Sequence, residues 1–173
     1  MLHKILVATT SSESSHHVFD QALMLAKAMG AHLGLLHVTD PDETDEDRPS
    51  YLDSLEPYLS EDDLDLYCYV GHFETFEPDL FGALVSKATA EGVSTDCIHC
   101  FGDPERAISD FAETWNADLI VVGRRGRSGM AEFFLGSVSN YTLHHAPCSV
   151  HIVHNPSTAH LETSVEHGIA AST

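Results

Sequence analysis

Short apolar runs alternate with longer segments of helical periodicity along most of this chain. The clearest run is 118–123 (DLIVVG), which is too short for a helix and apolar enough to be a buried strand. Between the runs, apolar residues recur at helical spacing, and Gly30 and Gly92 stand where a helix would end. This alternation predicts an α/β fold, in which an open parallel sheet carries helices on both of its faces.

The same pattern sets the approximate bounds of the elements. The expected strands are 4–8, 32–38, 93–101, 118–123 and Ser149–Val153. The expected helices are a first one capped by Ser11 or Ser12 and ending at Met29, then 78–91, a third that Asp103 caps and Pro104 begins, and 136–145. The pattern assigns no element to 39–73, and it leaves 155–173 as a polar, disordered tail.

Charge excludes two classes of partner. The formal net charge is −19, with 27 acidic against 8 basic residues. Nucleic acids and anionic membranes would repel such a chain, so we expect it to bind neither. Fifteen of the acids, with Arg48 as the one base, fall within 40–79. A general adaptation to salt would spread the acids over the whole surface, so this clustering favours a solvated acidic insertion at about 40–74.

Length and composition bound the class of protein. The chain has 173 residues, which corresponds to about one domain. It has no apolar run of the roughly 18 residues that a transmembrane helix needs, and its first residues lack the pattern of a cleavable leader. Four cysteines are too few for a disulfide scaffold. We therefore expect a cytoplasmic protein with one domain over 1–154.

A loop rich in glycine and arginine carries the chemistry. It follows the strand 118–123 and runs from Gly123 to Gly136, where Ser137 begins a helix. Glycines let the backbone approach an anion closely, and the free N–H groups of a helix N-terminus suit a phosphate. In an open parallel sheet, ligands bind beyond the carboxyl ends of the strands where the strand order reverses, and the first and fourth strands are the best place for that reversal. The residues alone leave open whether this is a phosphate site or a flexible loop with a serine cap.

The full spacing is more specific. The pattern Gly-x2-Gly-x9-Gly-Ser after an apolar strand resembles the nucleotide-binding motif of the universal stress protein family. The segments KILVATTSSESS, HVTDP and FGDPERAI are similar to that family's first strand and loop, its second strand end and its third strand-to-helix turn. The stretch from DLIVVGRRGRSG to SVHIV is similar to its last third. The resemblance covers most of the chain.

The resemblance implies a five-stranded sheet of order 3-2-1-4-5, a homodimer and membership of the ATP-binding branch. One group of residues would border the adenine and ribose, a second would contact the ribose and phosphates, and Mg²⁺ would be carried on the phosphates. The first group is Ala8, Thr9, Thr10 and Val38, and the second is Gly123, Arg125, Gly126, Gly136, Ser137, Val138 and Ser139. Val122 and Arg127 complete the expected set of nucleotide-binding residues.

One residue departs from the family pattern, and it opens alternatives. Thr10 stands where the family usually has Asp, which keeps a hydroxyl but removes a negative charge. One alternative is therefore that the preferred nucleotide is AMP or cyclic AMP and not ATP with Mg²⁺. Because the chain has neither a GxxxxGK[ST] loop nor a kinase-type HRD segment, and Glu132 is more simply a solvated loop residue, we expect a regulatory stress-response module with slow ATP hydrolysis at most. A weak ATPase and a nucleotide-free dimeric scaffold remain as alternatives.

Cysteine and histidine patterns favour structural roles. Side chains alternate along a strand, so Cys97 and Cys100 should point to opposite faces, which opposes both a metal site and a disulfide between them. We expect these two and Cys148 to be partly buried free thiols. The adjacent pairs His16–His17 and His144–His145 diverge on helices, so we expect no metal ion.

Two surfaces are candidates for partners. The last strand, Ser149–Val153, would lie at the edge of the sheet, where it can pair with its copy across a two-fold axis. The acidic insertion is either a partner surface, a lid over the nucleotide or a solubilising loop.

Overall fold

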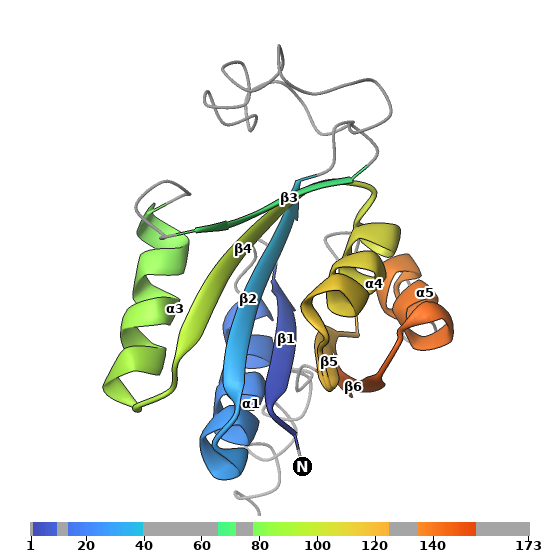
Figure 1. Ribbon diagram of the computed structural model, residues 1–173. Coiled ribbons are helices and arrows are strands. Elements are labelled where there is room, and N and C mark those ends of the chain that lie inside the picture. The colour runs from blue at the N-terminus through green and yellow to red at the C-terminus, as the bar shows by residue number, and fades with distance from the viewer. Residues whose placement is uncertain (1, 10–13, 40–65, 72–77, 125–134, 155–173) are drawn as a thin grey trace, which may run out of the picture.

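A computed structural model describes residues 2–9, 14–39, 66–71, 78–124 and 135–154 of the chain (Figure 1). The sequence-based expectations for Ser11 and Ser12, for the tail at 155–173 and for most of the acidic insertion lie outside these residues.

Five parallel strands form the body of the sheet. They are β1 (Lys4–Thr9), β2 (His32–Thr39), β4 (Thr95–Gly102), β5 (Leu119–Gly123) and β6 (Ser149–Val153). Their spatial order is β4-β2-β1-β5-β6, and every neighbouring pair among them is parallel. This arrangement confirms the expected fold class and the order 3-2-1-4-5 of the parallel strands, each of which lies within a few residues of its expected range.

A sixth strand was not expected. β3 (Leu66–Gly71) pairs antiparallel with β4 and extends the sheet beyond it. Its sequence, LYCYVG, is rich in aromatic and β-branched residues, which favour strands. The surrounding run of acidic residues concealed this short signal, so the sequence analysis left the segment unassigned.

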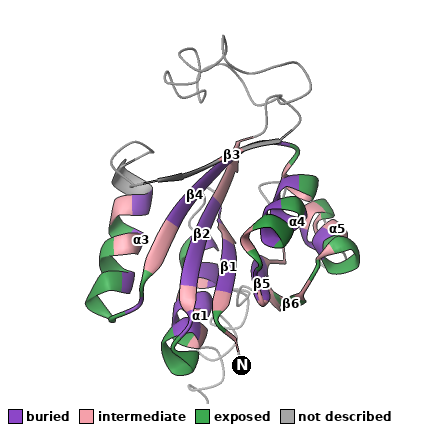
Figure 2. Ribbon diagram, in the orientation of Figure 1, coloured by how far each residue is buried: buried purple, intermediate pink, exposed green. Residues whose placement is uncertain are grey.

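Helices cover both faces of the sheet, as expected (Figure 1). One face carries α1 (Ser14–Met29) and α3 (Pro78–Ala90), and the other carries α4 (Pro104–Trp115) and α5 (Ser137–His145). The strands alternate their side chains between these two layers, which divides the core in two. Figure 2 shows the result: buried residues line the strands and the inner faces of the helices, and exposed residues follow the outer faces.

The ends of α4 illustrate how local sequence sets the bounds of a helix. The carboxylate of Asp103 accepts a hydrogen bond from the backbone N–H of Glu105 at 2.9 Å, and Pro104 occupies the first helical position. At the other end Asn116 takes the left-handed conformation with φ 55°, which asparagine tolerates better than most residues. The expected N-terminal cap of this helix is therefore confirmed.

No described helix is long and apolar enough to cross a membrane.

Candidate functional site

The strand order reverses between β1 and β5. These two strands are parallel neighbours, with Val7 opposite Val121, whereas the chain continues from β1 to β2 on one side and from β5 to β6 on the other. Ligands of open α/β sheets bind beyond the carboxyl ends of such a pair of strands. The first and fourth of the strands expected from the sequence, where the reversal was predicted, are β1 and β5.

Strand ends and the start of α5 bring the described candidate residues to this edge of the sheet. Ala8 and Thr9 end β1, Val38 lies one residue before the end of β2, and Val122 and Gly123 end β5. Gly136 precedes α5, which Ser137, Val138 and Ser139 begin. The remaining candidates, Thr10, Arg125, Gly126 and Arg127, lie outside the described residues, as does Glu132.

Backbone hydrogen bonds at Arg124 fix where α5 begins. The N–H of Arg124 donates to the carbonyl of Val153 at 2.8 Å, which continues the ladder between β5 and β6. The carbonyl of Arg124 accepts from the N–H of Gly136 at 2.9 Å and from the hydroxyl of Ser139 at 3.0 Å. The two ends of the glycine loop are thereby joined, and the N-terminus of α5 is held beside the end of β5.

The first turn of α5 has donors without helical partners. The cap residue Gly136 has extended geometry and no side chain to cap the helix, and the first helical bond runs from Asn140 N–H to the Gly136 carbonyl. In any α-helix the N–H groups before that bond have no acceptor within the helix. Here they belong to Ser137, Val138 and Ser139, and among the described residues no side chain caps them. They form a compact group of donors at the positive end of the helix dipole.

The two serines of this turn differ in what they offer. The Ser139 side chain is buried, and its hydroxyl donates to the carbonyls of Arg124 and Gly136 at 3.0 and 3.1 Å. Ser137 is exposed. A phosphate at this turn would therefore meet the hydroxyl of Ser137 and the backbone of Ser139, whose own hydroxyl holds the loop together.

Two histidines that no sequence pattern singles out, His37 and His99, lie beside the ends of β1 and β2. Nδ1 of His37 donates to the Thr9 carbonyl at 3.3 Å, and the ring of His37 lies 5.3 Å from that of His99. Nε2 of His99 is hydrogen-bonded to the hydroxyl of Thr39 at 2.8 Å. His37 therefore supports the last peptide of β1 beside the candidate site, and its place opposite Thr9 on the adjacent strand is the signal that would have indicated this role.

Burial keeps His99 uncharged. The residue is 4% exposed, and its ring contacts the rings of His37 and Phe101. Loss of hydration, followed by the proximity of His37, lowers the pKa of His99 to about 3.

The cysteines require a correction. Cys97 and Cys100 do point to opposite faces of the sheet, as expected, because they belong to different halves of the core. Cys100, however, is not a free thiol: it forms a disulfide with Cys68 on β3. Local sequence spacing offers only Cys97 as a partner for Cys100, because no local pattern assigns a strand to the segment that holds Cys68. Cys97 and Cys148 are free, as expected.

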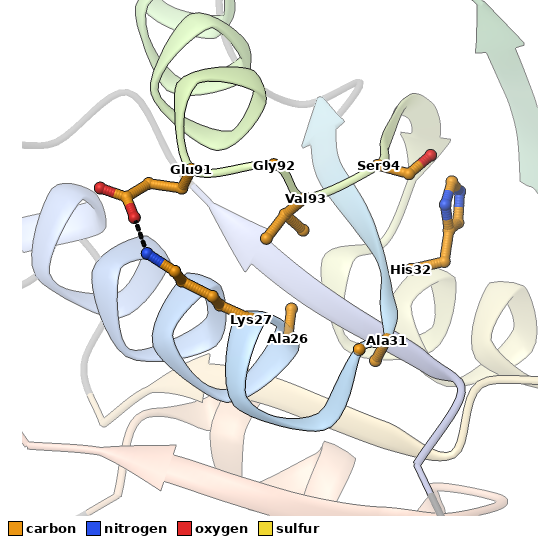
Figure 3. A pocket seen from close by; sticks show the side chains of 9 residues that line it. Ala26, Lys27, Ala31, His32, Glu91, Gly92, Val93 and Ser94 are labelled. Atoms are coloured by element: carbon orange, nitrogen blue, oxygen red, sulfur yellow. Dashed lines mark hydrogen bonds and ion pairs between the residues drawn. The ribbon is translucent and has the colours of Figure 1, made fainter.

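A pocket of about 430 Å³ lies at the opposite, amino-terminal end of the sheet (Figure 3). It is lined by the ends of α1 and α3 and by the residues that lead into β2 and β4, and an ion pair between Lys27 and Glu91 joins the two helices there. None of the predicted nucleotide-binding residues lines it. Its charged side chains are exposed and already paired, so it offers weaker ligand chemistry than the α5 end of the sheet.

Comparison with known proteins identifies the family of this chain. Residues 1–154 match the model of the Universal stress protein family. The universal stress protein Sll1388 of Synechocystis is 35% identical over 151 residues, which cover 87% of this chain and 96% of that protein.

Solved structures of low sequence identity share the fold. A universal stress protein in complex with cAMP is similar with a TM-score of 0.61 and 24% identity, over 90% of this chain and 99% of that one. A universal stress protein family protein from Arabidopsis thaliana with AMP bound has a TM-score of 0.57 and 20% identity, over 90% and 93%. With the family model matched over most of its length and a relative of 35% identity along nearly all of it, this chain belongs to the universal stress protein family.

Proposed function

We propose that this protein is a regulatory stress-response module that binds an adenine nucleotide at the carboxyl end of β1, β2 and β5. The adenosine would lie against the ends of β1 and β2, where Ala8, Thr9 and Val38 are found. The phosphates would lie at the N-terminus of α5. Similar proteins with AMP or cAMP bound support the choice of nucleotide.

The observation that carries this proposal is the uncapped first turn of α5 beside the strand-order reversal. Its N–H donors have no side-chain cap among the described residues, and the Arg124 carbonyl holds Gly136 in place by a hydrogen bond of 2.9 Å. An anion at this turn would gain hydrogen bonds from groups that are already oriented, and it would lie at the favourable end of the helix dipole.

The test removes one of these donors without altering the helix. Ser137 is the first helical residue, a position at which proline is well tolerated, and Gly136 before it already has the extended conformation that proline requires. Ser137→Pro therefore deletes an N–H, whereas the control Ser137→Ala deletes the hydroxyl and keeps the N–H. We expect Ser137→Pro to weaken binding of ATP or AMP by roughly 10- to 100-fold, as the loss of one hydrogen bond to a charged group would.

Calorimetric titration of each variant, with adenosine as a phosphate-free ligand, measures this effect. Adenosine affinity should be the same in the wild type and in both variants. If Ser137→Pro binds nucleotides as tightly as Ser137→Ala does, the phosphates do not use this turn and the proposed site is wrong.

ATP carried with Mg²⁺ is one form of the ligand, and the residue at position 10 bears on it. The family's usual aspartate would help to hold the nucleoside or its metal ion, and Thr10 lacks that charge. We expect Thr10→Asp to tighten binding of ATP with Mg²⁺ by about tenfold. Thr10→Asn is the control, because asparagine has a shape similar to that of aspartate and carries no charge. Equal or weaker affinity in Thr10→Asp would contradict this role.

AMP or cyclic AMP is the second candidate ligand. Two observations favour it: Thr10 supplies no carboxylate for a metal ion, and the two similar structures carry AMP and cAMP. Titration of the same protein with ATP, AMP and cyclic AMP, with and without Mg²⁺, decides between them. Steady phosphate release from ATP would instead support the weak-ATPase alternative, and no binding of any adenine nucleotide would support the scaffold alternative.

A further inference from the structure

The disulfide between Cys68 and Cys100 joins the acidic insertion to the sheet. The two residues lie directly opposite each other on the antiparallel strands β3 and β4 and are separated by 32 positions in the chain. Among the elements that the structure describes, β3 makes its extensive contacts with β4. β3 is thus held at the edge of the sheet by its ladder with β4 and by this single covalent link.

The two cysteines of the bridge differ in their exposure to solvent. Cys100 is fully buried in the layer under α4, whereas Cys68 is partly exposed at the margin of that layer. Cys68 is therefore the more accessible end of the bridge for a thiol from solution. Attack there would release Cys100 as the leaving group.

The free cysteines are poorly placed to exchange with this bridge. Cys97 lies on the other face of the sheet, and burial raises the pKa of its thiol to about 11. Burial also raises the pKa of the Cys148 thiol. Thiolates attack disulfides and thiols do not, so both groups are weak nucleophiles at neutral pH. The bridge accordingly depends on an external reductant.

The bridge is adjacent to the candidate nucleotide site. Cys100 is the register partner of Val38 on β2, and both side chains contact the same layer of the core as Ala8 does. Ala8 and Val38 are two of the residues expected to border the adenosine. A change in the pairing of β3 with β4 therefore occurs one strand away from the residues expected to border the adenosine.

We propose that the Cys68–Cys100 disulfide is a thiol-exchange site for a dithiol reductant. Its reduction releases β3 from β4 and thereby changes the affinity of the chain for adenine nucleotide. The release of β3 stands independently of the proposed function, whereas the effect on affinity rests on that function.

The exchange is balanced in two steps. One thiolate of the dithiol bonds to the Cys68 sulfur, the bond between Cys68 and Cys100 breaks, and Cys100 leaves as a thiolate that takes up a proton. The second thiol of the reductant then loses its proton and attacks its own mixed-disulfide sulfur, so that Cys68 leaves and is protonated in turn. Two electrons and two protons pass to the protein, and the dithiol becomes a disulfide.

The experiment compares the full-length protein before and after treatment with dithiothreitol. Thiol titration and peptide mapping establish the bridge, amide hydrogen exchange follows residues 66–71, and calorimetry measures AMP and ATP affinity. We expect two free thiols before reduction and four after it, as the pairing of Cys68 with Cys100 requires. We also expect exchange at 66–71 to be roughly tenfold faster, and nucleotide affinity to shift by about threefold or more.

Cys68→Ser should exchange fast at 66–71 with or without dithiothreitol. The matched control Cys148→Ser, which leaves the bridge intact, should respond as the wild type does. Should Cys68→Ser fail to fold, the two redox states of the wild type still give the comparison.

The outcomes separate the parts of the proposal. Four free thiols in the untreated protein, or equal amide hydrogen exchange at 66–71 in both redox states, would overturn the proposed release of β3, whatever the nucleotide result. Faster exchange with unchanged affinity would overturn the link to the nucleotide site. Absence of nucleotide binding in both states would overturn the proposed function and that link with it. The hydrogen-exchange data would still test whether reduction releases β3.

Discussion

At the scale of single residues, His99 is the titratable group most constrained by its surroundings. Its ring lies among those of His37 and Phe101, and its Nε2 is hydrogen-bonded to the Thr39 hydroxyl at 2.8 Å. A proton on this ring would have to be buried beside another histidine. The folded state therefore holds His99 neutral, with a pKa of about 3 against 6.5 for an ordinary histidine.

This difference makes the protein sensitive to acid. Between pH 6.5 and 3 the unfolded chain binds a proton at His99 that the folded chain does not, so stability falls as the pH falls through that range. The slope from this residue is at most about 1.4 kcal/mol per pH unit, or about 2 kcal/mol between pH 6.5 and 5. Above pH 6.5 both states hold His99 neutral, and its contribution to stability no longer changes.

Urea unfolding of the wild type and of His99→Gln at pH 7 and pH 5 measures the effect. The glutamine keeps a hydrogen-bonding side chain and removes the titration, so the variant should lose less stability on acidification than the wild type. His154→Gln, at an exposed position, should keep the wild-type pH dependence. An equal loss in His99→Gln and the wild type would show that His99 does not carry the acid response.

At the scale of elements, the sequence predicts best what local patterns determine. The five parallel strands and four helices follow from apolar periodicity, and the start of α4 follows from Asp103 and Pro104. The pairing of β3 with β4 depends on contacts between distant segments, which no local pattern encodes. The disulfide follows from that pairing, because only the register of the two strands sets Cys68 opposite Cys100.

The candidate site divides in the same way. The strand ends and the glycines were predictable, because the carboxyl ends of parallel strands share one edge of the sheet. What each side chain does there was not. No sequence pattern indicates that the Ser139 hydroxyl donates to the carbonyls of Arg124 and Gly136, as it does in the structure. His37 acquires its contact with Thr9 from the register of β1 and β2.

Packing between β2 and α4 yields a prediction at this scale. A Cβ atom at Gly34 would lie 2.9 Å from Cη2 of Trp115 and 3.1 Å from Cδ1 of both Ile98 and Leu6. At least one of these side chains must shift to admit a methyl group there. We expect Gly34→Ala to lower the free energy of unfolding by about 1–3 kcal/mol.

Thermal and urea unfolding of Gly34→Ala, of Trp115→Phe and of the double variant test this contact. The smaller Phe lacks the atom nearest to the new methyl group, so the double variant should be less destabilised than the sum of the two single variants. Strict additivity would indicate that α4 does not press on Gly34.

At the scale of the whole molecule, β6 is one of the two edge strands of the sheet that the structure describes. It pairs with β5 on one side, and Ser149 and His151 are exposed along it. Unpaired edge strands readily pair with a copy of themselves, and the dimers of such strands are related by a two-fold axis. In that arrangement the centre of the strand, at His151, would face its counterpart.

We therefore predict a homodimer at micromolar concentration, measured by light scattering. His151→Glu would set two carboxylates against each other at the axis and should shift the protein toward the monomer. His154→Glu, which adds the same charge just beyond the strand, is the control and should leave the dimer intact. A wild-type monomer, or a dimer equally stable in both variants, would exclude pairing through β6.

Calorimetric titration of the purified protein, freed of any bound nucleotide, tests most directly whether a nucleotide binds at the carboxyl end of the sheet. We predict saturable binding of AMP or ATP with a Kd below about 1 mM, which corresponds to at least about 4 kcal/mol of binding free energy. No saturable binding of any adenine nucleotide at millimolar concentration would contradict the proposed function, and the glycine loop with its helix would then be scaffold alone.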